Sequence, residues 1–318
     1  MSLLGYIGLL SLITITIQTL FWFYRNFFPH KFHPEKYGPG TWAVITGSSD
    51  GIGKGFANVL AQYGFKICLI ARNPEKLQTV KEEILKASPK AEIKIVIADF
   101  KKSLEPGFYD NVSNQLKDLD ISILINNVGV GNTGFFHKID NQKIDDVLLV
   151  NLFPQFYMTK KLIPQLLSRL PPSKALKSAV INVSSINGIR AFPYVCMYSA
   201  SKAFNDFLSR TLSIEYRNRI DFLSLRPGYV TSQMTYRKTG FDTISPEECA
   251  EGCLRDLGRK DWTFGHWKHE IVGTFACLVP ECVLMNAMKI VGPRVAKQIE
   301  LKEKKYQESL KAATAGAK

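Results

Sequence analysis

Short apolar segments alternate with longer amphipathic segments between residues 42 and 225, and this alternation limits the possible folds more than any other feature of the sequence. The apolar segments are predicted as strands at 42–46, 66–71, 92–98, 121–126, 179–184 and 221–225. Helices are predicted between them at 52–63, 74–87, 109–118, 141–169 and 194–217. Such alternation is typical of βαβ units and of a parallel, doubly wound sheet. We therefore predict an α/β, Rossmann-like single domain whose ligands bind outside the carboxyl ends of its strands.

The first predicted strand runs into a glycine-rich turn, Thr46-Gly47-Ser48-Ser49-Asp50-Gly51-Ile52-Gly53, which leads into the first predicted helix. Glycines allow the backbone to approach a pyrophosphate closely, and the amino terminus of the helix supplies N–H groups and a favourable dipole. In this strand–turn–helix context the turn predicts a nucleotide site. The residues predicted to bind the nucleotide here are Thr46, Gly47, Ser49, Gly51, Ile52 and Gly53.

Polar residues also follow the second, third and fourth predicted strands. Arg72 stands where an acidic residue would bind the ribose 2′-hydroxyl of NAD, and an arginine at that place accommodates the 2′-phosphate of NADP. The sequence therefore favours NADPH/NADP+ over NAD(H). Asp99 is placed to meet the adenine edge, and Asn126, Val128 and Gly129 are further predicted cofactor contacts after the fourth strand.

Tyr198 and Lys202 are four residues apart, so they are predicted to share one face of a helix. A free tyrosine has a pKa of about 10, and a nearby cation stabilises the phenolate and lowers that pKa toward neutrality. Tyr157 and Lys161 have the same spacing, so spacing alone does not identify the reactive pair. Tyr198 follows Ser185, which comes just after a predicted strand, whereas Tyr157 has no such serine and is interpreted as a packing residue.

Taken together, these motifs resemble those of the short-chain dehydrogenases/reductases. T-G-x-x-x-G-x-G, N-N-x-G, a serine after the fifth strand, Y-x-x-x-K and Pro227-Gly228 occur in the order of that family, between residues 40 and 230. The resemblance implies that Tyr198 is the general acid/base, and that Lys202 binds the nicotinamide ribose and lowers the tyrosine pKa. It implies that Ser185 orients the substrate carbonyl and that Asn151 supports a water relay for protons.

The same resemblance implies how the nicotinamide end of the site is closed. The turn after the sixth predicted strand would cover the nicotinamide through Pro227, Gly228, Val230 and Thr231. Tyr198 and Lys202 would contact the cofactor as well as the substrate.

Within the family, the run Lys36-Tyr37-Gly38-Pro39-Gly40-Thr41-Trp42 resembles the membrane-bound 17β-hydroxysteroid dehydrogenase branch, and in particular its type 12 group of very-long-chain 3-oxoacyl-CoA reductases. That resemblance implies NADPH-dependent reduction of long-chain 3-oxoacyl-CoA in fatty-acid elongation. Two alternatives stay open: a 17β-hydroxysteroid dehydrogenase that interconverts estrone and estradiol, and a non-catalytic membrane scaffold with a nucleotide-binding fold. Enzymes of fatty-acid elongation and a second copy of the chain are further candidate partners.

The amino-terminal region is predicted to anchor the chain in a membrane. Residues 3–24 carry no charge and are long enough to cross the hydrocarbon layer, and basic residues follow at once. The basic n-region and small-residue cleavage site of a signal peptide are missing. We expect an anchor at 1–28, a linker at 29–40, an NADP-binding dehydrogenase domain at 41–270 that faces the cytosol, and a location in the endoplasmic reticulum membrane. Type 12 enzymes often end in a dilysine retrieval signal, but this sequence ends Ala315-Gly316-Ala317-Lys318.

Charge and cysteine content narrow the classes of partner. The excess of 41 Lys+Arg over 28 Asp+Glu gives +13, which suits an acyl-CoA or an acidic membrane lipid, and no nucleic-acid partner is expected. Six cysteines are few for a chain of this length, so no disulfide framework is expected and a reducing compartment is predicted. Because they form no C-x-x-C pair, no metal site is predicted either.

The carboxyl-terminal part is predicted from shorter signals. Residues 235–244 suggest a mobile substrate loop, and 246–257 a helix capped by Ser245. Residues 271–318 are expected to form an apolar segment followed by a charged tail. The apolar part, 271–291, contains Glu281 and Lys289, so we expect it to dip into the membrane or cap the substrate rather than to span the bilayer.

Overall fold

The computed structural model describes residues 2–27, 31–169, 176–235 and 239–315. Two compact units are present, residues 1–32 and residues 33–318. The first unit contains helix α1 (Leu3–Phe27), in which the 18 residues Leu3–Leu20 have a mean hydropathy of 1.8 and are not buried. By length and composition α1 is a candidate membrane anchor, as the sequence predicted.

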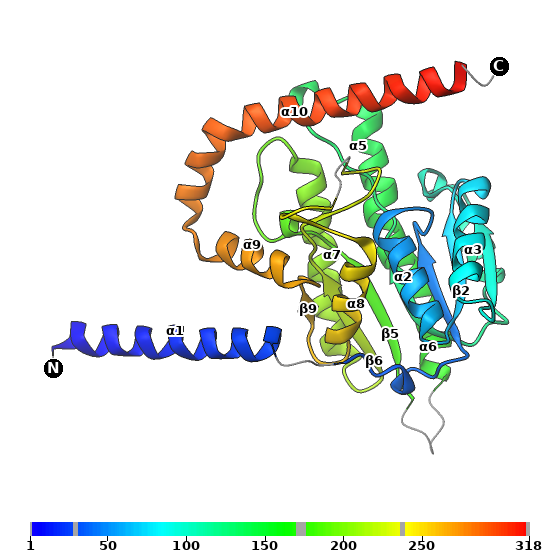
Figure 1. Cartoon of the computed structure of the whole chain (residues 1–318), viewed down its shortest axis with the longest axis horizontal. Coiled ribbons are helices and arrows are strands. Elements are labelled where there is room, and N and C mark those ends of the chain that lie inside the picture. Colours follow the sequence, from blue (N-terminus) through cyan, green and yellow to red (C-terminus); the bar gives the residue numbers. More distant parts are fainter. Residues whose placement is uncertain (1, 28–30, 170–175, 236–238, 316–318) are drawn as a thin grey trace. The chain divides into compact units, whose positions relative to one another are not determined.

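The second unit is built on a parallel sheet whose strands lie in the order β3-β2-β1-β4-β5-β6-β9 (Figure 1). The strands are β1 (Trp42–Thr46), β2 (Lys66–Ala71), β3 (Ile93–Ile97), β4 (Ile121–Asn126), β5 (Ser178–Val183), β6 (Ile220–Leu225) and β9 (Trp262–Thr263). The six predicted strands are therefore confirmed to within a residue at each end. Every residue of β1, β4 and β5 is buried, which explains why these strands are continuous apolar runs rather than alternating ones.

Helices flank this sheet, which confirms the predicted Rossmann-like class (Figure 1). Helix α2 packs against α3 and α8, whereas α6 packs against α4 and strand β4, and α7 lies along β5 and β6. Their bounds are α2 (Gly51–Gln62), α3 (Pro74–Ala87), α4 (Phe108–Asn114), α5 (Asn141–Val147), α6 (Phe153–Ser168), α7 (Cys196–Glu215) and α8 (Pro246–Asp256). Ser245 caps α8 as predicted, in a capping box with Glu248.

The predicted continuous helix at 141–169 is wrong in one respect. A π-helical segment, Leu148–Leu152, separates α5 from α6 and contains Asn151. Single π-helical turns inside helices are frequent at functional sites, because they turn a side chain out of the regular helical register. The predicted helix at 109–118 also ends early, at Asn114.

Part of the segment predicted as a linker packs against the second unit. A 3₁₀ helix spans Pro34–Lys36, and the buried Tyr37 donates a hydrogen bond to Asp221 Oδ2 at 2.8 Å. The Arg169 guanidinium also donates to the Tyr37 carbonyl at 3.1 Å. These contacts connect the chain just before β1 to the start of β6 and to the residue that follows α6.

The carboxyl-terminal segment forms two helices, α9 (Trp267–Leu278) and α10 (Glu281–Ala315). The axes of α9 and of the first part of α10 differ by 111°, across a break of Val279 and Pro280. Together the pair is as apolar as a candidate membrane span, and the bend is that of a broken span or of a re-entrant loop. Two short strands, β7 (Tyr229–Val230) and β8 (Thr243–Ile244), pair in parallel between β6 and α8 in the sequence.

Candidate active site

The glycine-rich turn closes tightly between β1 and α2. Gly47 has a φ of +63°, and a Cβ there would lie 2.8 Å from the Val128 Cα, so a side chain would collide with the segment after β4. A Cβ on Gly53 would lie 2.5 Å from the Gly47 carbonyl oxygen. The turn can therefore present its backbone N–H groups at the start of α2, the geometry that binds a phosphate.

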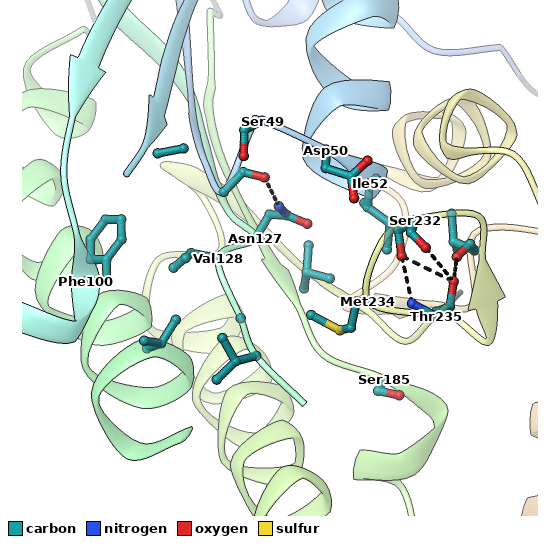
Figure 2. Close-up of a pocket in the computed structure, with 18 of the residues that line it drawn as sticks. Ser49, Asp50, Ile52, Phe100, Asn127, Val128, Ser185, Ser232, Met234 and Thr235 are labelled. Carbon is teal, nitrogen blue, oxygen red and sulfur yellow. Dashed lines mark hydrogen bonds between the residues drawn. The ribbon is translucent and has the colours of Figure 1, made fainter. Parts of the chain in front are cut away.

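A cavity of about 280 Å³ opens above this turn, at the carboxyl ends of the strands. Figure 2 shows part of its lining, with Phe100 on one side and Ser185 and Met234 on the other. Most predicted site residues line it: Gly47, Ser49, Gly51, Ile52, Arg72, Asp99, Val128, Gly129, Ser185, Tyr198, Lys202, Pro227, Gly228 and Val230. The fold thus gathers residues from positions 47 to 230 around one cavity. Its lining runs from the glycine-rich turn to Tyr198 and Lys202, as a dinucleotide site requires.

Three predicted cofactor residues support the lining from behind instead. The Thr46 hydroxyl accepts hydrogen bonds from the backbone N–H groups of Asn127 and Val128, at 3.0 and 3.2 Å. The Asn126 amide is fully buried and donates to Asn182 Oδ1 at 2.9 Å. Gly53 packs against the Gly47 carbonyl. These three residues are not part of the cavity wall.

Two further predicted residues also lie outside the wall. Thr231 donates its backbone N–H to the Ile244 carbonyl at 3.0 Å. Asn151 is fully buried, and its side chain both accepts from Val130 N at 2.7 Å and donates to Val130 O at 2.9 Å. A third hydrogen bond joins Asn151 Nδ2 to Ser201 Oγ at 3.0 Å. In this structure Asn151 fixes the segment after β4 to helix α7, and its part in a water relay stays a prediction.

Tyr198 and Lys202 lie one turn apart on α7. The Lys202 side chain is only 3% exposed, and its ammonium donates to the Val183 carbonyl at 2.8 Å. The same ammonium lies 5.7 Å from the centre of the Tyr198 ring. Because a buried cation is poorly solvated, burial lowers the pKa of Lys202 to about 8.

The ionisation of Tyr198 differs from the expected one. Burial raises the pKa of Tyr198, and a hydrogen bond with the Ser185 side chain opposes this effect without reversing it. The resemblance implied a tyrosine pKa lowered by Lys202, but the ammonium here is hydrogen-bonded to Val183 rather than to the phenol. The phenol is consequently held in its protonated form, which is the form that can donate a proton.

The second Y-x-x-x-K pair has the structural role that was predicted for it. The Tyr157 ring packs against the rings of Tyr109 and Phe156, at centroid distances of 4.7 and 4.3 Å. Lys161 forms an ion pair with Asp110 on the protein surface. Neither residue lines the cavity, so position in the fold, and not spacing, separates the two pairs.

Sequence reasoning missed part of the lining. The additional residues are Asp50, Ala71, Ala98, Phe100, Lys101, Asn127, Val130, Val150, Val183, Ser184, Ser232, Met234 and Thr235. Asp50 precedes α2, but its carboxylate does not cap that helix and instead accepts from the Gln233 backbone N–H at 2.7 Å. This bond holds the 232–235 segment against the glycine-rich turn, as the labelled Asp50, Ser232 and Thr235 in Figure 2 illustrate. Asp50 and Asn127 stood inside motifs already singled out, whereas Met234 carried no sequence signal.

Comparison with known proteins gives consistent results. The profile of the short chain dehydrogenase family matches residues 41–241. A very-long-chain 3-oxoacyl-CoA reductase of Anas platyrhynchos is 35% identical over 79% of this chain and 80% of the relative. A human relative named inactive hydroxysteroid dehydrogenase-like protein 1 is 34% identical, over 81% and 78% of the two chains. The solved structure of a 7β-hydroxysteroid dehydrogenase shares the fold, with a TM-score of 0.63, 24% identity, and coverage of 75% of this chain and 91% of that chain. The family profile covers more than half of the chain, and relatives about 35% identical align with most of its length. The protein therefore belongs to the short-chain dehydrogenase/reductase family of oxidoreductases.

Proposed function

We propose that the protein is an NADPH-dependent reductase that converts the 3-keto group of long-chain and very-long-chain 3-oxoacyl-CoA to a 3-hydroxyl group, as a step of fatty-acid elongation. The observation that carries this proposal is that Ser185, Tyr198 and Lys202 line one cavity in a chain similar to very-long-chain 3-oxoacyl-CoA reductases. The net charge of +13 suits an anionic acyl-CoA.

The residues that line the cavity fit a dinucleotide. Gly47 and Gly51 both have positive φ values, and the backbone they shape lies at the amino terminus of α2, where a pyrophosphate is favoured. Arg72 at the end of β2 is exposed and available to a 2′-phosphate. Gly129 leaves the space beside Lys202 open, because a Cβ there would lie 3.4 Å from the Lys202 ammonium. Arg72 would hold the adenosine end of NADPH, and Lys202 would hold the nicotinamide ribose.

The chain's own residues can complete the reduction. When bound, NADPH supplies the hydride that adds to the keto carbon. The Tyr198 phenol donates its proton to the carbonyl oxygen as that oxygen becomes an alkoxide, and the Ser185 hydroxyl donates a hydrogen bond to the same atom. The raised pKa of Tyr198 keeps the proton on the phenol until it is needed. The Lys202 ammonium, 5.7 Å from the ring centre, stabilises the phenolate that remains.

The substrate class is tested by following NADPH oxidation by the detergent-purified protein with a long-chain 3-oxoacyl-CoA and with estrone at matched concentrations. We expect turnover of the acyl-CoA and little turnover of estrone. A preference for estrone would replace the proposal with a 17β-hydroxysteroid dehydrogenase. Binding of NADPH without turnover of either substrate would remove both.

A second candidate is a non-catalytic protein that keeps the nucleotide-binding fold. The observation that favours it is the relative named inactive, whose identity of 34% is close to that of the reductase relative. The presence of Asn151, Ser185, Tyr198 and Lys202 in this chain argues against it. Loss of turnover on substitution of Tyr198, argued in the Discussion, distinguishes the two.

Arg72 is expected to set the preference for NADPH. Replacing it with glutamate should raise KM for NADPH by about 10-fold to 150-fold, because charged hydrogen bonds contribute about 1.5–3 kcal/mol, and should leave KM for NADH within about threefold. Arg259→Glu makes the same change of charge at an exposed residue outside the cavity wall and serves as the control. Equal losses with both cofactors, or an equal effect of Arg259→Glu, would contradict the assignment of Arg72 to the 2′-phosphate.

We further propose that the protein resides in the endoplasmic reticulum membrane with its catalytic unit in the cytosol. The uncharged residues 3–24 of α1 and the basic residues that follow them in the sequence support this orientation. Asn111 begins the sequence Asn-Val-Ser and is exposed on α4, so it reports on orientation. In cells that glycosylate such sites Asn111 should stay unmodified, and a glycan there would place the unit in the lumen.

A further inference from the structure

The turn that follows β6 has two sides. On one side Pro227 and Gly228 line the cavity beside Tyr198 and Lys202. Part of its support is local, because Ile186 donates its backbone N–H to the Pro227 carbonyl at 3.0 Å. The opposite side is covered by an element distant in sequence, the first turn of helix α9.

His269 makes this contact. Its side chain is 2% exposed, and its Nε2 lies 3.1 Å from the Tyr229 carbonyl oxygen. A Cβ on Gly228 would lie 2.7 Å from His269 Cδ2 and 3.1 Å from Nε2, so the imidazole ring rests directly against the backbone of the turn. A side chain at position 228 would collide with the ring where it now lies. The contact with His269 therefore explains the glycine at this position, in addition to its place in the cavity lining.

The chemistry of the contact follows from its geometry. A carbonyl oxygen can only accept, so His269 Nε2 carries the proton and donates it to Tyr229. Both the neutral ring with its proton on Nε2 and the charged ring can make this bond. Burial lowers the pKa of His269 to about 4, so the ring is neutral at physiological pH. The neighbouring titratable groups that face it, His266 and Lys268, act in the same direction. The bond is therefore a constant feature of the turn and not a pH-dependent one.

Helix α9 is held firmly enough to place this ring. His266 caps the helix by accepting from the Lys268 backbone N–H at 3.2 Å. One turn further on, Gly273 packs against the buried Phe264 ring, which a Cβ on Gly273 would meet at 2.1 Å. Phe264 directly follows β9, so α9 is fixed to the edge of the sheet and presents His269 to the turn.

We propose that His269 is a positioning residue that fixes the Pro227–Gly228–Tyr229 turn against the nicotinamide half of the bound cofactor. The inference rests on the proposed function, because it takes the cavity beside Tyr198 as the nicotinamide site. Loss of the donor would free the turn to move away from that half, while the adenosine half, bound near Arg72, would be unaffected.

The test compares two ligands by direct binding titration of the full chain in detergent: NADPH, and adenosine 2′,5′-bisphosphate, which lacks the nicotinamide half. His269→Leu should raise Kd for NADPH by about fivefold to tenfold, the factor that one net hydrogen bond corresponds to, and leave Kd for the bisphosphate within twofold. His269→Gln, which can offer an amide N–H to the same carbonyl, should recover most of the NADPH affinity.

His266→Ala is the matched control, since it weakens the cap of α9 without removing the bond to Tyr229. If His266→Ala weakens NADPH binding as much as His269→Leu, or if His269→Leu weakens both ligands equally, the effect is general loosening of the fold and the inference is overturned. Because neither titration needs a substrate, its outcome is separate from that of the proposed reaction. A wild-type protein that binds NADPH but reduces neither test substrate would overturn the proposed substrate and leave this inference standing.

Discussion

Tyr198→Phe is expected to lower kcat by about 10³-fold or more while leaving Kd for NADPH within about threefold. Tyr198 and Lys202 are the α7 residues that line the cavity, and the Tyr198 phenol is the neutral hydroxyl of the pair, the group assigned to donate a proton to a carbonyl oxygen. General acid catalysis contributes about 10²–10⁴-fold, and a donor aimed at the developing alkoxide adds to this figure. Phenylalanine keeps the ring and removes only the hydroxyl, so the cavity should retain its shape.

The chain offers a matched control in its second Y-x-x-x-K pair. Tyr157→Phe makes the same chemical change at a ring that packs against Tyr109 and Phe156, away from the cavity wall. It should keep at least about half of the wild-type kcat, since surrounding packing is preserved. Steady-state reduction of 3-oxoacyl-CoA gives kcat for both variants, and a separate binding titration gives Kd for NADPH. Comparable turnover in wild type and Tyr198→Phe would remove Tyr198 from the chemistry, and absence of turnover in both would favour the non-catalytic candidate.

The centre of the sheet could be predicted because strands β1, β4 and β5 are buried on both faces. Val44, Leu124 and Val180 belong to runs in which every residue faces the core, and such runs are visible in a sequence. Strand β9 could not be found in this way, because only Trp262 and Thr263 form it and they pair with the last two residues of β6. Two residues carry no period, and only the tertiary fold makes them a strand.

The candidate site was predictable where a motif and a strand end coincide. Gly47, Arg72 and Ser185 follow that rule and line the cavity. Other predicted residues, such as Thr46 and Asn126, lie one layer behind the wall and hold its backbone, and their contact with a cofactor stays a prediction. A motif identifies such residues as a set. It does not distinguish the residues that contact a ligand from the residues that support them.

The remaining residues reach the site only through long-range folding. Met234 lines the cavity because the 232–235 segment is held over the glycine-rich turn by Asp50, and His269 reaches the turn after β6 because α9 docks on Phe264. Both depend on contacts between positions far apart in sequence, and no local pattern records them. The π-helical turn at Asn151 is similar, since no proline or glycine within Leu148–Leu152 marks it.

Lys202→Met is expected to lower activity and to raise stability at the same time. The ammonium is 3% exposed with a pKa lowered to about 8, so the folded protein holds a cation in a place that disfavours charge. Relative to its ordinary value of 10.5, that difference corresponds to about 3 kcal/mol, of which the lost hydrogen bond to Val183 offsets about 1 kcal/mol. Methionine fills a similar volume without charge, so the unfolding free energy at pH 7 should rise by about 2 kcal/mol, and the thermal midpoint by roughly 4 °C.

The difference in stability between Lys202→Met and wild type should depend on pH. Below pH 8 the lysine is protonated in both the folded and unfolded states, and the folded state carries the whole cost of the buried charge. Between pH 8 and 10.5 the folded protein binds fewer protons than the unfolded chain, so wild-type stability should gain with rising pH relative to Lys202→Met, and the advantage of the variant should shrink. Thermal midpoints measured in detergent at pH 7, 8, 9 and 10 follow this convergence, because all other groups titrate alike in the two proteins.

Activity should change in the opposite direction, with kcat/KM for the acyl-CoA reduced by about 10²-fold or more, because the phenolate left on Tyr198 loses its neighbouring cation. Lys161→Met is the matched control: Lys161 pairs with Asp110 at the surface, and exposed pairs contribute at most about 1 kcal/mol, so neither activity nor pH dependence should move appreciably. A Lys202→Met protein that is less stable than wild type at pH 7 would mean that the ammonium stabilises the fold. A stable but fully active one would mean that Tyr198 works without it. The expected combination, a more stable and less active protein, is what a cation retained for chemistry at the expense of the fold should produce.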